Sequence, residues 1–238
     1  AAVISLIGGT MFLMWLGEQI TSRGIGNGVS LIIMAGIVAH LPTTLVNLLE
    51  GGRTGSIDPV RLIGIVVAVV ILVLFICFME RAQRRILIQY PKRATQRGMQ
   101  ADRSHLPLKI NTAGVIPPIF ASSLLLMPLT ISQFAGQRVA GESRWGDFII
   151  SLNQYLQHGS PVYMLLYGAG IIFFSFFYTA VVFNPEETAD NLKKNGGSIP
   201  GIRPGKRTAD YLEYVLTRIT VVGAVYLTLV CVLPEYMI

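Results

Sequence analysis

The sequence predicts an all-α integral membrane protein, a bundle of several membrane-spanning helices. Of its residues, 52% are hydrophobic and only 13% are charged, whereas a soluble domain carries roughly a quarter of its residues as charges. Six runs contain no Asp, Glu, Lys or Arg: residues 1–17, 24–49, 62–79, 110–137, 148–185 and 219–234. A helix needs about 20 mostly apolar residues to cross the hydrocarbon core. We therefore expect six spans, the first of them cut short.

Each run has its own helix signals. The second follows the turn-forming segment 24–28, where Asn27 or Ser30 is expected to cap the helix. The third is rich in Val and Ile, but its unbroken length favours a helix in lipid over a strand. The fourth is interrupted by Pro117 and Pro118. Residues 161–183 are the expected spanning part of the fifth run. The sixth helix is expected to begin before its uncharged run, so that Arg218 lies near the membrane surface and its long side chain can snorkel.

The basic residues indicate an orientation. If the spans alternate, only Arg53, Arg61, Arg138 and Arg144 of the 19 basic residues fall on one side. The positive-inside rule then places the other side in the cytoplasm. This concentration of charge indicates an anionic partner there, either lipid headgroups, an acidic protein or RNA. The alternative is that these residues are topology signals only.

The first long polar loop, residues 80–111, has the pattern of a β-hairpin. Two short β-prone runs, 85–90 and 105–110, flank the polar tip 91–104. Pro107 limits the second run to an edge strand. The tip carries basic residues that suit salt-sensitive phosphate contacts, namely Lys92, Arg93, Arg97 and Arg103.

The second polar loop, residues 184–211, predicts a short helix followed by a stiff turn. Asn184 is the expected N-cap and Pro185 fits the first helical position. Gly196 and Gly197 end the helix. Two Pro-Gly pairs, 200–201 and 204–205, then bracket Arg203 and hold it out from the chain. From spacing alone, a turn whose Arg touches lipid headgroups is an equal alternative.

The sequence lacks the usual parts of an enzyme. It has no GxSxG element, no carboxylate pair within a span and no His or Cys set at metal-ligand spacing. Cys77 and Cys231 are expected to be small apolar residues within spans. We therefore expect no catalytic site, metal or cofactor. Within the spans, Val29 and Ile33 lie one helical turn apart, a spacing that ordinary packing also produces.

Several motifs, in order along the chain, resemble the SecY family, the channel subunits of the bacterial Sec protein translocase. They are MFLMWLGEQIT at 11–21, RGIGNG at 23–28, ERAQRR at 80–85, HLPLKIN at 105–111, AGVIP at 113–117, FNPEETADNLKK at 183–194 and PGIRPG at 200–205. The resemblance implies a ten-helix bundle of two inverted halves around a pore, of which this chain covers the fourth to ninth helices. Residues 1–49 would end the N-terminal half, 50–61 would form an external hinge loop, and 62–238 would belong to the C-terminal half.

The resemblance also implies roles for single residues. Val29, Ile33 and Ile119 would form the apolar pore ring, which keeps ions out by dewetting. The lateral gate, through which signal sequences reach lipid, would use Asn111, Ile119, Ser122, Ser123 and Met127. Basic residues of the two cytoplasmic loops would dock the SecA ATPase or the ribosome: Arg84, Arg85, Lys92, Arg93, Arg97, Lys193, Lys194, Arg203, Lys206 and Arg207.

The function implied by the resemblance is a passive channel for unfolded preproteins in the bacterial plasma (inner) membrane. Its implied partners are SecE and SecG, SecA, the ribosome, preprotein signal sequences and membrane lipids. A secondary transporter is the alternative, because spans broken by Pro and Gly also build substrate sites. It would require an ionisable group facing a cavity, which the sequence does not indicate. A docking scaffold without a pore is a third hypothesis.

Overall fold

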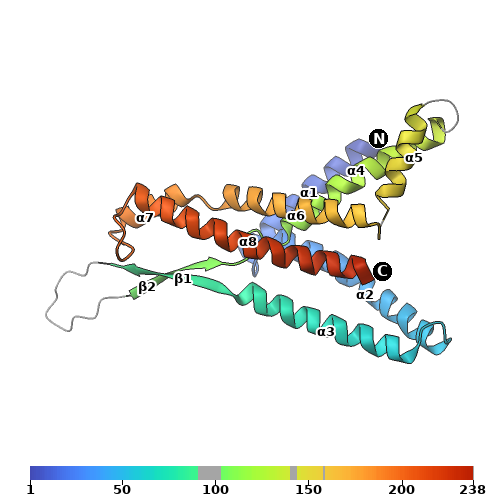
Figure 1. The fold of residues 1–238 in the computed structure, drawn as a ribbon, viewed down its shortest axis with the longest axis horizontal. Helices are drawn as coiled ribbons and strands as arrows, with labels where there is room; N and C mark the ends of the chain where they lie inside the picture. Colours follow the sequence, from blue (N-terminus) through green and yellow to red (C-terminus); the bar gives the residue numbers. More distant parts are fainter. Residues whose placement is uncertain (91–102, 140–143, 158, 238) are drawn as a thin grey trace. The chain divides into compact units, whose positions relative to one another are not determined.

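The computed structural model describes residues 1–90, 103–139, 144–157 and 159–237. They belong to two compact units, Ala1–Ile71 and Leu72–Ile238 (Figure 1). Within the described residues, six helices are long and apolar enough to cross a membrane. The six expected spans are thereby confirmed. They correspond to α1 (Ala2–Arg23), α2 (Gly28–Arg53), α3 (Pro59–Arg81), α4 (Ile116–Val139), α6 (Pro161–Val182) and α8 (Lys206–Met237).

In the first unit, α1 and α2 form a closely packed helical pair. The Thr21 hydroxyl donates to the Gly17 carbonyl at 2.9 Å and accepts from the Gly28 backbone N–H at 2.8 Å. A Cβ at Gly17 would lie 2.9 Å from Cγ2 of Val29, so a larger residue there would force the Val29 side chain to shift. Asn27 caps α2 by accepting from the Val29 N–H at 3.1 Å.

The connection between α2 and α3 is shorter than the expected loop 50–61. Helix α2 continues through Arg53, and α3 begins at Pro59. Thr54 extends the end of α2, because its N–H and its hydroxyl both donate to the Glu50 carbonyl at 2.8 Å. Glu50 and Arg61, the charges that ended the uncharged runs, therefore lie within helices.

In the second unit, α4, α6 and α8 pack around a small core. Its buried residues are Ala121, Ile171, Tyr226 and Leu227. Glycines of α6 make the packing close: a Cβ at Gly168 would lie 3.2 Å from Thr228, and one at Gly170 would lie 3.2 Å from Ala121. Small residues are what allows helices to approach in a membrane. Helices α4 and α8 run in one direction and α6 in the other (Figure 1).

The predicted β-hairpin is present. Strands β1 (Gln83–Gln89) and β2 (Arg103–Lys109) pair antiparallel, with Ile86 opposite Leu106 and Arg85 opposite Pro107. One face of the hairpin packs against the start of α8. The buried core there contains Ile86, Leu108, Ile199, Leu212, Val215 and Ile219.

One helix was not expected from the sequence. Helix α5 (Arg144–Tyr155) is too short to span a membrane. It begins before the uncharged run 148–185 and extends into it. The side-chain Oδ1 of its Asn153 accepts a 2.6 Å hydrogen bond from the Ser132 hydroxyl of α4. Hydrophobic side chains remain exposed on α5, among them Trp145, Phe148 and Ile150. Its sequence is amphipathic, which is typical of a helix lying at a membrane surface.

Candidate functional site

Helix α7 (Pro185–Lys194) begins with the predicted cap. The side-chain oxygen of Asn184 accepts from the N–H groups of Glu186 and Glu187, at 3.1 and 3.4 Å. Pro185 takes the first position, where its missing N–H costs nothing. The helix ends at Lys194, and Gly196, two residues later, has a φ of 74°. The chain therefore leaves the membrane at α6 and turns at once into a short polar helix.

The turn after α7 is fixed by its backbone. Gly201 and Gly205 have φ values of 82° and 111°, in the region that favours glycine, which explains both Pro-Gly pairs. The Ile199 side chain is buried, and the Thr208 hydroxyl donates to the Arg203 carbonyl at 3.0 Å. The Arg203 side chain is exposed. A rigid backbone thus presents a solvent-accessible guanidinium.

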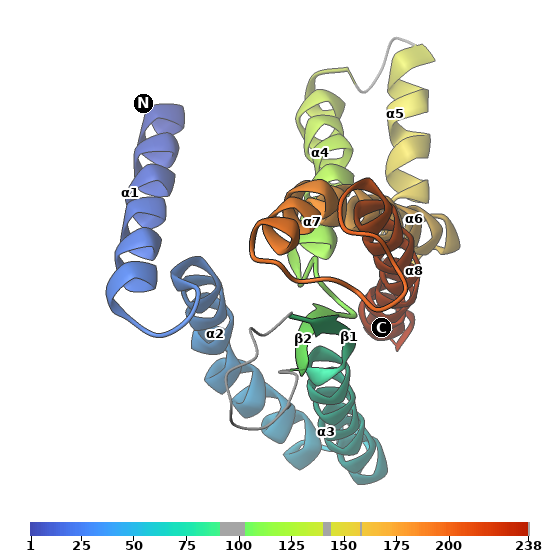
Figure 2. The same cartoon turned by 90° about the vertical axis from the view of Figure 1, so that its left-hand side faces the viewer.

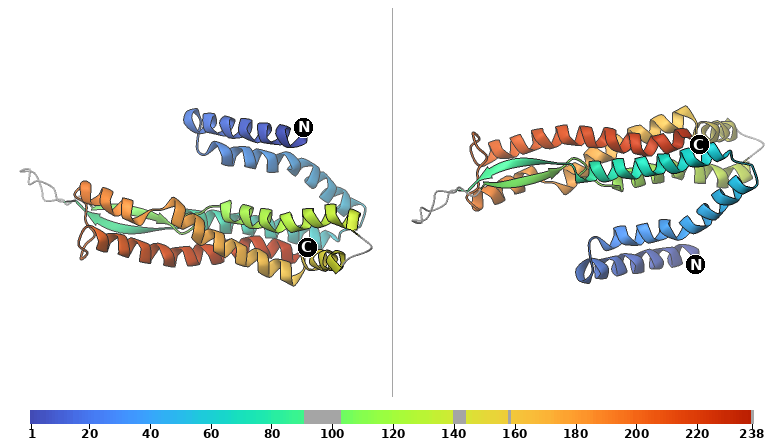
Figure 3. Two further views of the ribbon diagram at one scale, coloured as in Figure 1. Left: turned by 90° about the horizontal axis from the view of Figure 1, so that it is seen from above. Right: turned by 90° about the horizontal axis from the view of Figure 1, so that it is seen from below.

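The hairpin and this turn are joined to one another. Gln89 and Ser198 form an isolated antiparallel bridge, in which each backbone N–H donates to the other residue's carbonyl, at 2.8 and 2.9 Å. Next to it, a Cβ at Gly197 would lie 2.8 Å from the Tyr90 ring. Figures 2 and 3 show the segment between α7 and α8 reaching the hairpin at one end of the second unit. We call residues 82–90, 103–111 and 184–205 the joined loops, and this end the hairpin end.

The basic residues expected to dock a partner lie on the joined loops and at the start of α8. All those within the described residues are exposed: Arg84 and Arg85 on β1, Lys193 and Lys194 at the end of α7, Arg203 in the turn, and Lys206 and Arg207 at the start of α8. The expected contacts Lys92, Arg93 and Arg97 lie outside the described residues. Two loops separated by the α4 to α6 region therefore contribute to one basic end.

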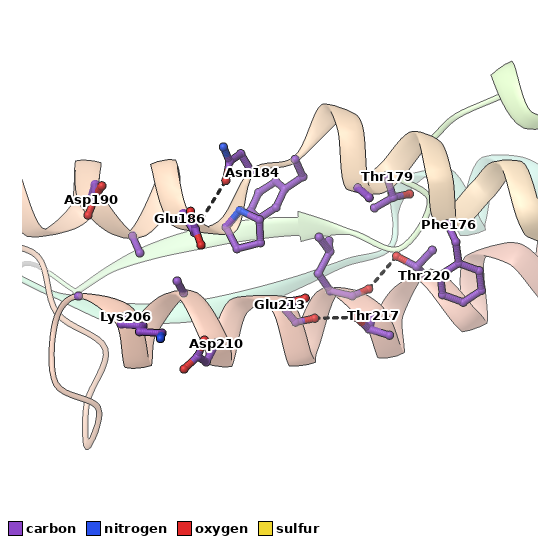
Figure 4. Close-up of a pocket in the computed structure, with 17 residues that line it drawn as sticks. Phe176, Thr179, Asn184, Glu186, Asp190, Lys206, Asp210, Glu213, Thr217 and Thr220 are labelled. Atoms are coloured by element: carbon purple, nitrogen blue, oxygen red, sulfur yellow. Dashed lines mark hydrogen bonds between the residues drawn. The ribbon is translucent and has the colours of Figure 1, made fainter.

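A groove of about 560 Å³ lies beside the Arg203 turn, between α7 and the ends of α6 and α8. Its polar rim is mostly acidic: Glu186 and Asp190 come from α7, and Asp210 and Glu213 come from α8 (Figure 4). Apolar residues of α6, such as Phe176, line its membrane end. The basic residues of the loop do not predict this groove. The spacing Glu186 to Asp190, one helical turn, was the available signal.

Asn111, expected at the lateral gate, is buried at the junction of β2 and α4. Its amide Nδ2 donates to Oε1 of Glu80 at 2.9 Å and to the Gly114 carbonyl at 3.4 Å. No sequence signal pointed to Glu80 as its partner. The other gate candidates lie on α4, where Ser122 is half-buried and Ile119, Ser123 and Met127 are exposed.

The expected interruption of the fourth span by Pro117 and Pro118 is wrong. Helix α4 begins at Ile116, so both prolines lie in its first turn, where no intrahelical N–H bond is lost. Ile119 follows directly after them. Residues 110–115 precede the helix as turns, and Gly114 has a φ of 67°.

The expected pore-ring residues are distributed over both units. Val29 and Ile33 lie one turn apart on α2 and are each 45% exposed. Ile119 of α4 is 42% exposed and belongs to the second unit. Each is a branched apolar side chain that remains partly exposed. Their meeting in a ring remains a proposal.

The spans and the joined loops define a multi-span α-helical membrane protein with a built polar surface at one end. A family model described as SecY matches residues 1–238. The chain belongs to the SecY family.

Two relatives illustrate the similarity. "Protein translocase subunit SecY" of Escherichia coli (strain K12) is 54% identical over 237 residues, which are 99% of this chain and 52% of that protein. The protein of the same description from Rickettsia conorii is 53% identical over 234 residues, covering 98% of this chain and 52% of the relative. The chain thus spans about half the length of the curated relatives it matches.

Two solved structures share the fold. One is described as "The plug domain of the SecY protein stablizes the closed state of the translocation channel and maintains a membrane seal". It has a TM-score of 0.65 and 20% identity, and the match covers 96% of this chain and 57% of the other. The second, "The structure of a protein conducting channel", has a TM-score of 0.63, 18% identity and the same coverage. At these identities the likeness concerns the fold alone.

Proposed function

We propose that the chain forms part of the central pore subunit of a Sec translocon in the bacterial plasma membrane. In this role it is a passive protein-conducting channel, which exports unfolded preproteins and releases membrane segments sideways into lipid. The observation that carries the proposal is the Gln89–Ser198 bridge, which joins two loops into one basic, exposed surface. A rigid backbone that leaves the Arg203 side chain exposed is suited to docking by an external motor protein or a ribosome.

The proposal assigns roles to the residues described above. The joined loops face the cytoplasm and dock SecA or the ribosome through Arg203 and its basic neighbours, and SecE and SecG complete the complex. Val29, Ile33 and Ile119 line the constriction, where exposed branched side chains would exclude water and ions while no polypeptide is present. Asn111 and the α4 residues Ile119, Ser122, Ser123 and Met127 line the gate that signal sequences open.

The channel is favoured over the secondary transporter by the family to which the chain belongs. The basic surface also favours it over a small-solute transporter, because such a transporter has no need of a large protein partner. A docking scaffold without a pore shares the same surface. The family to which the chain belongs also favours the channel over that alternative.

Arg203→Glu in the full-length gene product tests the proposal, because it reverses the charge on a fixed backbone. We expect preprotein transport into vesicles reconstituted with SecE, SecG and SecA, and the stimulation of SecA ATP hydrolysis, to fall at least about tenfold. Such a loss corresponds to about 1.4 kcal/mol of coupling. Arg53→Glu, which changes another exposed Arg at the C-terminal end of α2, is the matched control. Equal transport by the two variants would exclude the role of Arg203.

A further inference from the structure

The base of the hairpin is closed by a side-chain hydrogen bond between its two legs. Glu80 is the penultimate residue of α3, and Asn111 follows β2 by two residues. Although they are 31 residues apart, Asn111 Nδ2 donates to Glu80 Oε1 at 2.9 Å. A backbone bond from the Ile110 N–H to the Ala82 carbonyl, 3.3 Å long, lies beside it. The two legs of the hairpin therefore cannot separate without breaking this side-chain bond.

Asn111 is held from several directions. Its side chain is only 6% exposed, so its amide cannot replace a lost protein partner with bulk water. Its neighbour Ile110 lies against α8, where a Cβ on Gly223 would collide with the Ile110 carbonyl. Helix α4 begins five residues after Asn111. Asn111 and its contacts therefore restrain the segment that leads into α4.

Glu80 is the member of this pair that can exchange its protein hydrogen bond for one with water. Its side chain is exposed, so water can solvate the carboxylate when the bond breaks. A bond from an amide to a carboxylate is stronger than one between two neutral groups. In the structure the pair is bonded and ties the segment before α4 to the end of α3. Breaking the bond would leave the Glu80 carboxylate in water.

We propose that Glu80 is a positioning residue of the lateral gate. By holding Asn111 it keeps the start of α4 in the bonded position, and it passes a displacement of the hairpin on to α4. This inference rests on the proposed function. It implies that loss of the Glu80–Asn111 bond lowers the binding free energy that a signal sequence must supply to open the gate.

The experiment measures selectivity in the full-length gene product, reconstituted in vesicles with SecE, SecG and SecA. Two preproteins are compared, one with an intact signal sequence and one with a single charged residue in the apolar part of its signal. We expect Glu80→Ala to raise the ratio of defective to intact transport about fivefold, the lower range for coupled sites. Asn111→Ala should do the same, and the double variant should add nothing further. Additive effects or an unchanged ratio would overturn the inference.

Three further variants separate the bond from general damage to the fold. Glu80→Gln keeps a carbonyl oxygen that can accept from Asn111, so its ratio should stay near that of the unchanged protein. Thr112→Ala is the matched control, because the Thr112 hydroxyl donates only to the Lys109 carbonyl, at 3.0 Å. Asn111→Asp brings two carboxylates together and should raise the ratio, and adding Glu80→Lys should restore it. An Asn111→Asp effect that Glu80→Lys does not reverse would contradict the proposal.

Failure of this inference and failure of the proposed function give different results. Unchanged protein that transports neither preprotein would overturn the proposed function, and the role of Glu80 with it. Normal transport with the same ratio for Glu80→Ala as for Thr112→Ala would overturn the role of Glu80 alone. Measuring the amount of each variant in the vesicles ensures that the ratio reports selectivity.

Discussion

Ser198 is hydrogen-bonded through both its N–H and its carbonyl to the backbone of Gln89, at 2.9 and 2.8 Å. The two residues belong to loops that are more than a hundred positions apart in the chain. Because Ile199 is buried against Ile86 and Leu108 directly after the bridge, the turn cannot swing away independently of the hairpin. A partner that pushes on Arg203 therefore also pushes on β1.

Ser198→Pro tests this connection. Proline has no N–H, so the bond to the Gln89 carbonyl is lost, at a cost of about 1 kcal/mol. We expect the Gln89 amide, which donates to the Ser198 carbonyl, to exchange its hydrogen several-fold faster in exchange mass spectrometry or NMR. Ser198→Ala keeps both backbone bonds and should exchange at the original rate. Equal exchange in the two variants would mean that the bridge does not restrain the loops.

Gly223→Ala should destabilise the second unit. The added Cβ would collide with the Ile110 carbonyl, and backbone cannot move aside as a flexible side chain can. Overpacking of this kind costs about 1–3 kcal/mol, so the protein in detergent should unfold at a lower temperature. Gly64→Ala of α3, with nothing within 4 Å of the new Cβ, should leave the melting temperature unchanged or slightly raised. The prediction fails if both variants melt alike.

Ile119→Ser tests the pore ring. A hydroxyl in place of the branched side chain would let water occupy an apolar constriction. We expect a higher ion conductance of the resting channel in planar bilayers. Leu124→Ser changes another residue of α4, which is 58% exposed against 42% for Ile119 and lies outside the proposed ring. This variant should leave the conductance low. Equal leakage from both variants would place Ile119 away from the constriction.

Much of the fold could be predicted because its signals are local. The length of an uncharged run decides whether a helix can span, and this alone locates the six spans. The hairpin follows from two β-prone runs around a polar tip, and α7 from a cap residue followed by Pro185. Within α2, the choice between Asn27 and Ser30 as cap needed the structure, which shows the Asn27 side chain on the Val29 N–H.

The remaining features depend on tertiary contacts. No local sequence pattern indicates that Gln89 pairs with Ser198, or that the exposed Glu80 accepts a hydrogen bond from Asn111. The acidic rim of the groove combines Glu186 and Asp190 of α7 with Asp210 and Glu213 of α8, so no single stretch of sequence indicates it. Pro117 and Pro118 were misinterpreted because a proline pair has the same sequence in the middle of a helix and in its first turn. Only the start of α4 at Ile116 distinguishes these cases.

The pairing of the hairpin also determines what cannot bind to it. Gln89 directs its N–H and carbonyl toward Ser198, away from β2, and antiparallel ladders alternate in this respect. By this alternation the backbone nitrogen of Pro107, opposite Arg85, faces the open edge of β2, where it offers no donor. The β1 edge is thus occupied at Gln89, and the β2 edge is interrupted at Pro107. Addition of an extended polypeptide to this sheet as a third strand is therefore disfavoured at Gln89 on one edge and at Pro107 on the other.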